Sequence, residues 1–180
     1  MLREFVETVF RADYYVWSYL NVRWHNELGD TIMPFLRNQW FWAPLYLFLL
    51  VFTTRTYGKN GWIWCAAFLI TFGLSDQISA SILKPLFGRI RPCNDPVFAQ
   101  YVHIIVPCGG GKSFPSSHAT NHFALAVFSA LSLGHHGRWI WPVALLWAAS
   151  VAYAQVYVGV HYPLDVFCGG LLGTGIGWFT

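Results

Sequence analysis

Long runs without a charged side chain are the feature that most limits how this chain can fold. Such runs include residues 38–54, 60–75, 113–137, 139–164 and 166–180. A helix needs about 20 mostly apolar residues to cross the roughly 30 Å hydrocarbon core of a bilayer. The runs therefore predict an all-α, polytopic membrane helix bundle of about five spans. We place the spans near residues 39–55, 61–84, 117–134, 138–157 and 163–180.

Composition supports a membrane location and argues against a nucleic-acid partner. The 180 residues are 56% hydrophobic and 11% charged, whereas an average soluble domain has about 25% charged residues. The formal net charge is only +3, and the aromatic residues lie within apolar runs rather than among basic residues, unlike the pattern of nucleic-acid-binding proteins. The length suits a single domain over residues 1–180, and no obligate protein partner is evident.

The first 37 residues differ from the rest because charges are interspersed with apolar residues. The apolar side chains recur at roughly helical spacing, at Phe5, Val9, Tyr14, Trp17 and Leu20. This pattern predicts one or two amphipathic helices at the membrane surface, with the break between them at Gly29-Asp30. The transmembrane bundle would then occupy residues 38–180. The opening residues are too polar for the apolar core of a cleavable signal peptide.

Five spans place alternate connections on opposite sides of the membrane. The turns at 55–60 and 134–138 share one side, and residues 1–37, 85–116 and 158–162 share the other. The two short turns carry three basic residues and no acidic residue. This favours the cytoplasm for them, because cytoplasmic loops are enriched in Lys and Arg. The opposite side, which holds the long 85–116 connection, is then extracytoplasmic.

Three polar clusters fall at helix ends on this second side. Polar groups are expensive in a bilayer, so their positions are informative about function. The clusters are Lys84 with Arg89 and Arg91, then Pro115-Ser116-Ser117-His118, and finally His161-Tyr162-Pro163-Leu164-Asp165. The predicted bundle thus gathers two or three cations, two hydroxyls, two imidazoles and one carboxylate in one place.

The cations and hydroxyls of this set are suited to binding a phosphate. Lys84 and Arg91 would neutralise its oxygens, and the guanidinium allows bidentate contact. Ser116 is expected at a helix N-cap after Pro115, where exposed backbone N–H groups and the helix dipole form an anion site. The alternative for the basic pair is snorkelling to the membrane surface, and the alternative for the serines is a simple helix cap.

The two imidazoles and the carboxylate are suited to the transfer of a phosphoryl group. His161 can attack phosphorus if Asp165, within one helical turn, holds its tautomer and stabilises the imidazolium that results. His118 is the remaining acid–base group, able to protonate the departing oxygen and then to activate water. As an alternative, His118 and His122 at four-residue spacing would begin a metal site.

These residues resemble the signature of the type-2 phosphatidic acid phosphatases, also called lipid phosphate phosphatases, which share a core with the vanadium haloperoxidases. The family's motifs are K-x6-R-P, P-S-G-H and S-R-x5-H-x3-D. The matches are Lys84, Arg91 and Pro92, then Pro115, Ser116 and His118, then His161 and Asp165. The resemblance implies that Lys84, Arg91 and Ser116 bind phosphate. It also implies that His161 forms a phosphohistidine, with His118 as general acid and Asp165 orienting it, and that no metal or other cofactor is needed.

Two positions depart from the family's pattern. Ser117 replaces the glycine of the second motif, and its backbone N–H can still serve if its side chain points away from the phosphate. Ala154-Gln155 stands where the third motif has Ser-Arg, so Gln155 keeps a hydrogen-bond donor but lacks a positive charge. Phosphoryl transfer depends on positioning and charge stabilisation. The site must therefore compensate, for which Arg89 is a candidate, or accept weaker stabilisation.

The resemblance is greatest to short bacterial undecaprenyl-diphosphate phosphatases. It implies a lipid phosphatase of the bacterial inner membrane whose active site faces the periplasm. The expected substrate is a polyprenyl phosphate or a phospholipid whose tail enters sideways between helices. Undecaprenyl diphosphate is the favoured substrate, and phosphatidylglycerophosphate, phosphatidate and lipid A 1-phosphate are the alternatives. A rival of another class is a lipid-phosphate binder or transporter that uses the same cationic site without hydrolysis.

The four cysteines fit no zinc-binding pattern. Cys65 and Cys168 lie inside apolar runs, where they are expected to pack as small apolar residues. Cys93 and Cys108 bracket the polar part of the long connection. A disulfide between them is expected if this connection faces an oxidising compartment, and two free thiols are the alternative.

Two features of the spans themselves need an explanation. Asp76 lies deep in the second span, where an ionisable group needs a partner, and it either supports Lys84 or lines the lipid path. Gly169, Gly173 and Gly177 recur every four residues in the last span. Such a stripe of small residues is typical of close helix packing in membranes.

Overall fold

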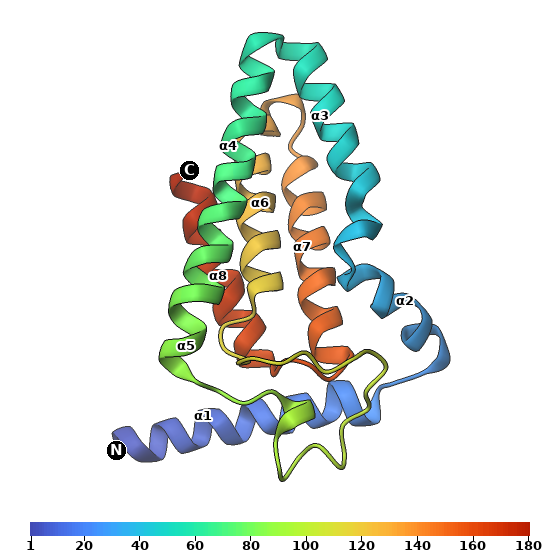
Figure 1. Ribbon diagram of the computed structural model, residues 1–180, viewed down its shortest axis with the longest axis vertical. Helices are drawn as coiled ribbons and strands as arrows, with labels where there is room; N and C mark the ends of the chain where they lie inside the picture. The colour runs from blue at the N-terminus through green and yellow to red at the C-terminus, as the bar shows by residue number, and fades with distance from the viewer.

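The computed structural model describes the backbone of residues 1–180 and every side chain except that of Leu2. It confirms the all-α fold class, and the described chain contains no strand (Figure 1). The helices are α1 (Leu2–Trp17), α2 (Glu27–Arg37), α3 (Ala43–Tyr57), α4 (Lys59–Asp76), α5 (Lys84–Phe87), α6 (Ser117–Leu133), α7 (Ile140–Tyr157) and α8 (Pro163–Phe179).

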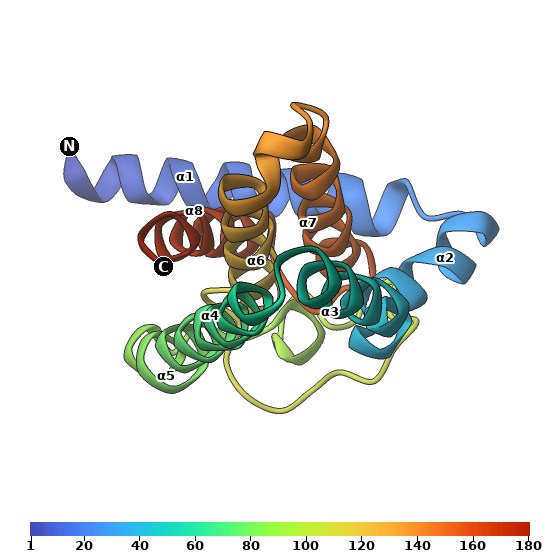
Figure 2. The same ribbon diagram turned by 90° about the horizontal axis from the view of Figure 1, so that it is seen from above.

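Helix α6 forms the centre of the bundle. It packs against α4, α7 and α8, and α1 runs across one end of the bundle (Figures 1 and 2). The glycine stripe of α8 makes the contact with α6 very close. A Cβ atom on Gly173 would lie 2.1 Å from the carbonyl oxygen of Thr120, and one on Gly177 would lie 2.2 Å from that of Ala124. The predicted role of this stripe in close helix packing is therefore confirmed.

The outer surface of the bundle is apolar. Large apolar side chains that face outward include Leu47, Phe48, Trp62, Ile63, Leu69, Leu146, Phe167 and Leu171. The helical stretches Lys59–Asn94 and Ile140–Tyr157 are each long and apolar enough to cross a membrane. Helices α3, α6 and α8 have 15, 17 and 17 residues, which is short for a span, so the number of five spans stays a prediction.

The N-terminal break lies earlier than we expected. Helix α1 continues into a wide helical turn at Ser18–Arg23, and α2 begins at Glu27, where the Asn26 side chain caps the N–H of Gly29 at 2.8 Å. The predicted break at Gly29-Asp30 is therefore wrong, and both residues belong to the first turn of α2. Gly29 serves packing instead, because a Cβ atom there would lie 2.2 Å from the hydroxyl of Tyr157.

The second expected span is also more irregular than its sequence indicates. The helix widens over Gln77–Leu83, resumes as α5, and stops at Gly88, which adopts a left-handed conformation with φ of 63°. Helix α3 begins at Ala43 rather than near residue 39, because Gln39–Trp42 forms a tighter turn. Helices α3 and α4 meet at the end of the bundle far from α1 and diverge towards α1 (Figure 1).

The long connection between α5 and α6 covers the same end of the bundle as α1 (Figure 1). The buried amide of Asn21 fastens it, because this side chain donates to the carbonyl oxygens of Tyr157 at 2.6 Å and His103 at 2.9 Å and accepts from the N–H of His103 at 3.0 Å. A disulfide joins Cys93 to Cys108, with the Cα atoms 6.0 Å apart. Of the two states considered for these cysteines, the bridged one is present.

Candidate active site

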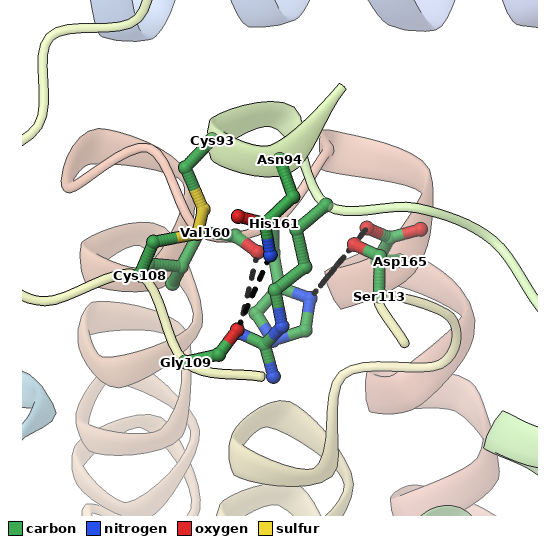
Figure 3. The surroundings of a disulfide bond; sticks show 9 residues. Cys93, Asn94, Cys108, Gly109, Ser113, Val160, His161 and Asp165 are labelled. Atoms are coloured by element: carbon green, nitrogen blue, oxygen red, sulfur yellow. Dashed lines mark hydrogen bonds and ion pairs between the residues drawn. A yellow bond between two sulfur atoms is a disulfide. The ribbon is translucent and has the colours of Figure 1, made fainter. Parts of the chain in front are cut away.

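The turn between α7 and α8 holds His161 in the interior. Its backbone N–H donates to the carbonyl oxygen of Gln155 at 3.2 Å, and the residue is 1% exposed. Nδ1 of the imidazole lies 3.3 Å from the hydroxyl of Ser113 and 3.5 Å from Oδ2 of Asp165 (Figure 3). Because Nδ1 faces these two groups, Nε2 is the ring nitrogen left for a substrate.

Three donors fix the carboxylate of Asp165, which is fully buried in the first turn of α8. The backbone N–H of Tyr162 donates to Oδ2 at 2.8 Å, the hydroxyl of Ser113 donates to the same oxygen, and Arg89 donates to Oδ1 at 2.7 Å. The 3.5 Å separation from His161 exceeds a normal hydrogen bond. Asp165 therefore acts on the imidazole through its charge and through the shared Ser113.

The guanidinium of Arg89 links the site to α1. Its second terminal nitrogen lies 2.5 Å from Oδ2 of Asp13, and Oδ1 of Asp13 accepts from the N–H of Leu164 at 2.7 Å at the start of α8. The same guanidinium lies 4.1 Å from the centre of the Tyr162 ring. Arg89 is thus paired with two carboxylates, and our suggestion that it compensates for Gln155 as a phosphate ligand does not fit this geometry.

Burial sets the protonation state of His161. Removal from water lowers the pKa of its imidazole to about 4, although the interaction with the nearby carboxylate of Asp165 raises it, and the positive charges of Arg91 and Lys84 lower it further. The ring is therefore neutral at neutral pH. A neutral imidazole has the free electron pair that a nucleophile needs.

Three partly buried cations at this end of the bundle have no carboxylate partner among the described side chains. They are Lys84 and Arg91, both predicted, and Arg37 at the end of α2, which was not predicted. Arg91 makes one long contact, 3.5 Å from the carbonyl oxygen of Val160. The Nε atoms of Arg91 and Arg37 are buried without a hydrogen-bond partner in the described residues. We call these three residues the cation cluster.

The N-terminus of α6 meets the start of α8. Ser116 is the predicted N-cap, fully buried, with its side chain accepting from the N–H of Ala119 at 3.5 Å and its own N–H donating to the carbonyl oxygen of Asp165 at 3.0 Å. The hydroxyl of Ser117 is buried without a partner among the described groups. The structure thereby brings the second and third polar clusters together.

Gln155 occupies the last turns of α7 and is fully buried. Its carbonyl oxygen receives the N–H of His161, which places the two residues side by side. Neither the oxygen nor the nitrogen of its side-chain amide has a hydrogen-bond partner in the described chain. A buried amide without partners costs free energy unless another molecule satisfies it. Gln155 is therefore available to a ligand or to water.

A cavity of about 660 Å³ opens between the diverging helices α3 and α4, with α6 behind it. Its walls are mostly apolar, and Ser117 and His118 are among the residues that line it. Asp76 also lines it and accepts from the amide nitrogen of Asn121 at 3.0 Å. Of the two roles considered for Asp76, lining the lipid path agrees with this position, and its hydrogen-bond partner is Asn121 rather than Lys84.

The pair His118 and His122 is not arranged as the start of a metal site. Nδ1 of His122 lies 2.8 Å from the carbonyl oxygen of His118 on the preceding turn. Among the described side chains, no group of three or more His, Cys, Asp or Glu residues gathers in a metal-binding arrangement.

Three residues of the site were not predicted from the sequence. Ser113 lies in the long connection, Asp13 in α1 and Arg37 in α2, and none belongs to a motif with fixed spacing. One signal was available for the two charged residues, since each interrupts an amphipathic segment next to apolar neighbours. That signal does not distinguish an inward-facing charge from a solvated one.

Taken together, fold and site define a class of protein. A bundle with an apolar outer surface gathers a neutral buried imidazole, a fixed carboxylate and unpaired cations at one end, beside an apolar cavity. These are the parts of a membrane enzyme that transfers a phosphoryl group from a lipid, because such transfer depends on a positioned nucleophile and on neutralised phosphate charge.

The chain belongs to the PAP2 superfamily, since a family model of that description matches residues 61–180. It is 35% identical over 158 residues to a lipid A 4'-phosphatase of Bacteroides thetaiotaomicron, an alignment that covers 86% of this chain and 69% of the relative. It is 31% identical over 142 residues to an undecaprenyl-diphosphatase of Sulfolobus acidocaldarius, covering 79% and 63%. The chain thus spans about two thirds of the length of these curated relatives.

Its fold is similar to that of LpxE from Aquifex aeolicus, with a TM-score of 0.70, 26% sequence identity and coverage of 92% of both chains. The family match and the phosphatase relatives make this chain a membrane lipid phosphatase. The sequence prediction of that superfamily and of that reaction class is confirmed.

Proposed function

We propose that this lipid phosphatase works through a phosphohistidine on His161. The observation that carries the proposal is the setting of this residue. The ring is neutral and buried, its Nδ1 side is turned towards Ser113 and Asp165, and cations without a protein counterion act on it. Nε2 is then the attacking atom, and Asp165 stabilises the positive charge that develops on the ring.

Two chemical steps complete the reaction. In the first, a bond forms between Nε2 of His161 and phosphorus, the bond from phosphorus to the lipid oxygen breaks, and that oxygen takes a proton from His118. In the second, His118 takes a proton from water, the water oxygen attacks phosphorus, and the nitrogen–phosphorus bond breaks to release inorganic phosphate. The proposed mechanism uses no metal and no other cofactor.

The groups around His161 bind the phosphate. Lys84 and Arg91 neutralise its charge, and Ser116, Ser117 and the first-turn N–H groups of α6 supply donors. Gln155 adds the donor of its unpaired amide. These roles are supported by burial and by the absence of protein partners for Arg91 Nε, the Ser117 hydroxyl and the Gln155 amide among the described residues.

The cavity between α3 and α4 is the proposed site of the lipid chains. It reaches from His118 into the apolar face of the bundle, so a lipid can keep its tails in the bilayer while its phosphate enters the site. We place the active site on the extracytoplasmic face of the bacterial inner membrane. The Cys93–Cys108 disulfide supports this orientation, because disulfides persist in oxidising compartments.

For the substrate, we propose the 4'-phosphate of lipid A rather than undecaprenyl diphosphate. The similarity to a lipid A 4'-phosphatase supports this choice. The cavity wall supports it too, since it includes two polar residues, Asp76 and His122, and the Nε2 atom of His122 is buried without a hydrogen-bond partner among the described residues. A prenyl chain is hydrocarbon and offers these polar groups no further partner, whereas a glycolipid with amide and hydroxyl groups on its acyl chains can hydrogen-bond to them.

Undecaprenyl diphosphate stays the second candidate, because the relative from Sulfolobus acidocaldarius is an undecaprenyl-diphosphatase. The test is phosphate release by the purified protein in detergent with EDTA present. The four substrates are lipid A bearing only the 4'-phosphate, lipid A bearing only the 1-phosphate, undecaprenyl diphosphate and phosphatidylglycerophosphate. We expect the highest kcat/KM on the 4'-phosphate and no release by His161→Ala. A higher kcat/KM on undecaprenyl diphosphate would reverse the order of the candidates.

A lipid-phosphate binder without hydrolysis is the alternative from another class. In that case none of the four lipids would release phosphate, although the protein would still bind them. If EDTA abolished release, the metal-free mechanism proposed above would be wrong.

A further inference from the structure

Arg37 is a partly buried cation whose position on α2 is unusual. The helix turns the apolar side chains of Leu28, Ile32 and Phe35 outward, where they are 69%, 39% and 55% exposed. Arg37 lies at the last position of the helix, and its Nε is buried without a hydrogen-bond partner in the described chain. An arginine that only snorkels to a membrane surface keeps its head in water, and the buried Nε of Arg37 does not fit that role.

The packing of α2 carries Arg37 to the active site. Gly29, near the start of α2, touches Tyr157 at the end of α7, and the Trp42 ring just beyond α2 lies 5.7 Å from that of Trp147. The segment therefore runs antiparallel along α7, and Arg37 lies between these two contacts, beside the part of α7 that precedes His161. The Trp147 ring also lies 5.1 Å from that of His122, one turn after His118 on α6, so the end of α2 is at the level of His118 in the bundle. The charge of Arg37 acts on both Arg91 and His118.

The cation cluster is incomplete without an anion. Burial, and then the charge of Arg91, lower the pKa of the Arg37 guanidinium. Like charges repel most strongly where water is scarce, and an unpaired buried charge is strongly destabilising. A phosphate monoester carries about −1.5 to −2 charges at neutral pH and offers several acceptor oxygens, so it can relieve both penalties at once.

We infer that Arg37 is a third cationic ligand of the phosphoryl group, beside Lys84 and Arg91. The inference rests on the proposed function, because it assigns the ligand to the same site. It also explains how the site tolerates the neutral Gln155 on α7, since α2 supplies a positive charge in its place. Arg89 is paired with two carboxylates and cannot supply it.

The experiment compares Arg37→Gln and Arg37→Lys with the wild type. Arg23→Gln is the matched control, because Arg23 is an exposed arginine in the same N-terminal region. Inorganic phosphate is the probe, its affinity measured by titration calorimetry on detergent-solubilised protein, and kcat/KM is measured on the best lipid. The unfolding temperature of each variant reports whether it is folded.

We expect Arg37→Gln to weaken phosphate binding by at least tenfold and to lower kcat/KM by about 100-fold, in line with the loss of one charge-stabilising donor. Arg37→Lys should recover part of both, and Arg23→Gln should match the wild type. If Arg37→Gln folds and stays within twofold of the wild type in phosphate affinity, the inference is wrong. It is also wrong if both Arg37 variants lose stability and activity equally, because that result assigns Arg37 a structural role.

A second variant keeps the test independent of the stability of one protein. Arg37→Gln combined with Gln155→Arg moves the charge to α7, and it should bind phosphate at least tenfold more tightly than Arg37→Gln alone. Failure of the proposed function would look different. In that case the wild type would release no phosphate from any lipid, while the calorimetric difference between the wild type and Arg37→Gln would persist.

Discussion

The guanidinium of Arg89 lies 2.7 Å from the carboxylate of Asp165, the residue that faces His161. The pair is buried, and the other end of the guanidinium is held by Asp13 of α1. Helix α1 is therefore part of the support of the carboxylate that we propose assists His161. Detaching α1 from the site should therefore lower the rate of phosphoryl transfer as well as weaken the association with the membrane.

Replacing Asp13 tests this link between α1 and the site. Asp13→Asn removes one of the two carboxylates that balance Arg89, so the guanidinium can shift and Asp165 loses its fixed orientation. Breaking one partner of a buried pair costs about 3 to 5 kcal/mol of stability. We therefore expect a clearly lower unfolding temperature and a lower kcat with little change in KM. Arg11→Gln, an exposed position on the same helix, is the control and should leave both unchanged.

Ser113 and Asp165 should differ in how much activity depends on them. Asp165→Asn leaves the geometry but removes the charge that stabilises the imidazolium, and the comparable change in a serine protease triad lowers kcat by about 10⁴-fold. Ser113→Ala removes one of three donors to Asp165, whereas Arg89 and the Tyr162 N–H remain. We expect a loss of about tenfold for Ser113→Ala, by the net worth of one hydrogen bond. Equal losses in both variants, measured as kcat on the same lipid, would contradict this ranking.

The pH dependence of stability should reveal the buried neutral His161. Burial lowers the pKa of this imidazole in the folded protein to about 4, whereas an unfolded chain has a histidine pKa near 6.5. Between these values the unfolded state binds a proton that the folded state does not. Stability is therefore fully present above about pH 6.5 and falls towards pH 4, by up to about 1.4 kcal/mol per pH unit.

The comparison with His161→Gln isolates this contribution. Glutamine does not titrate, so the unfolding temperature of this variant should fall less between pH 7 and pH 5 than that of the wild type. Parallel curves for the two proteins would show that His161 is not held neutral by the fold.

The Cys93–Cys108 bridge supports the turn that carries His161. Cys93 packs in one cluster with Tyr157, Val158 and Val160, and Cys108 lies against the same cluster. Cys93→Ser with Cys108→Ser should lower stability by about 3 kcal/mol, the value expected for a loop of this length. Cys168→Ala is the control. An unfolding temperature that does not respond to reductant in the wild type would contradict a structural role for the bridge.

Much of this structure could be predicted from its sequence because unpaired polar groups are energetically unfavourable in the hydrocarbon core of a bilayer. The charge-free runs located five long helices, and the polar residues left at their ends were those that now surround His161. The pairing of His161 with Asp165 followed from their spacing at the start of a helix. These conclusions needed only local periodicity and one rule about burial.

What could not be predicted depends on contacts between distant segments. Gly29 resembled a helix break, but it is the place where the Tyr157 ring packs. Arg89 resembled a phosphate ligand, but α1 supplies the carboxylate that occupies it, and this is visible only once Asp13 is placed. Arg37 carried no motif at all, and only the antiparallel packing of α2 on α7 brings it to the site.

The most direct test of the account is the detection of the covalent intermediate. Purified protein would be mixed with its best lipid substrate, quenched in base within milliseconds to seconds, digested and examined by mass spectrometry. The account predicts an acid-labile phosphoryl group on His161, more abundant in a variant that lacks His118 as the base for hydrolysis, and absent from His161→Ala. Turnover by His161→Ala at the wild-type rate, or a phosphoryl group on another residue, would contradict it.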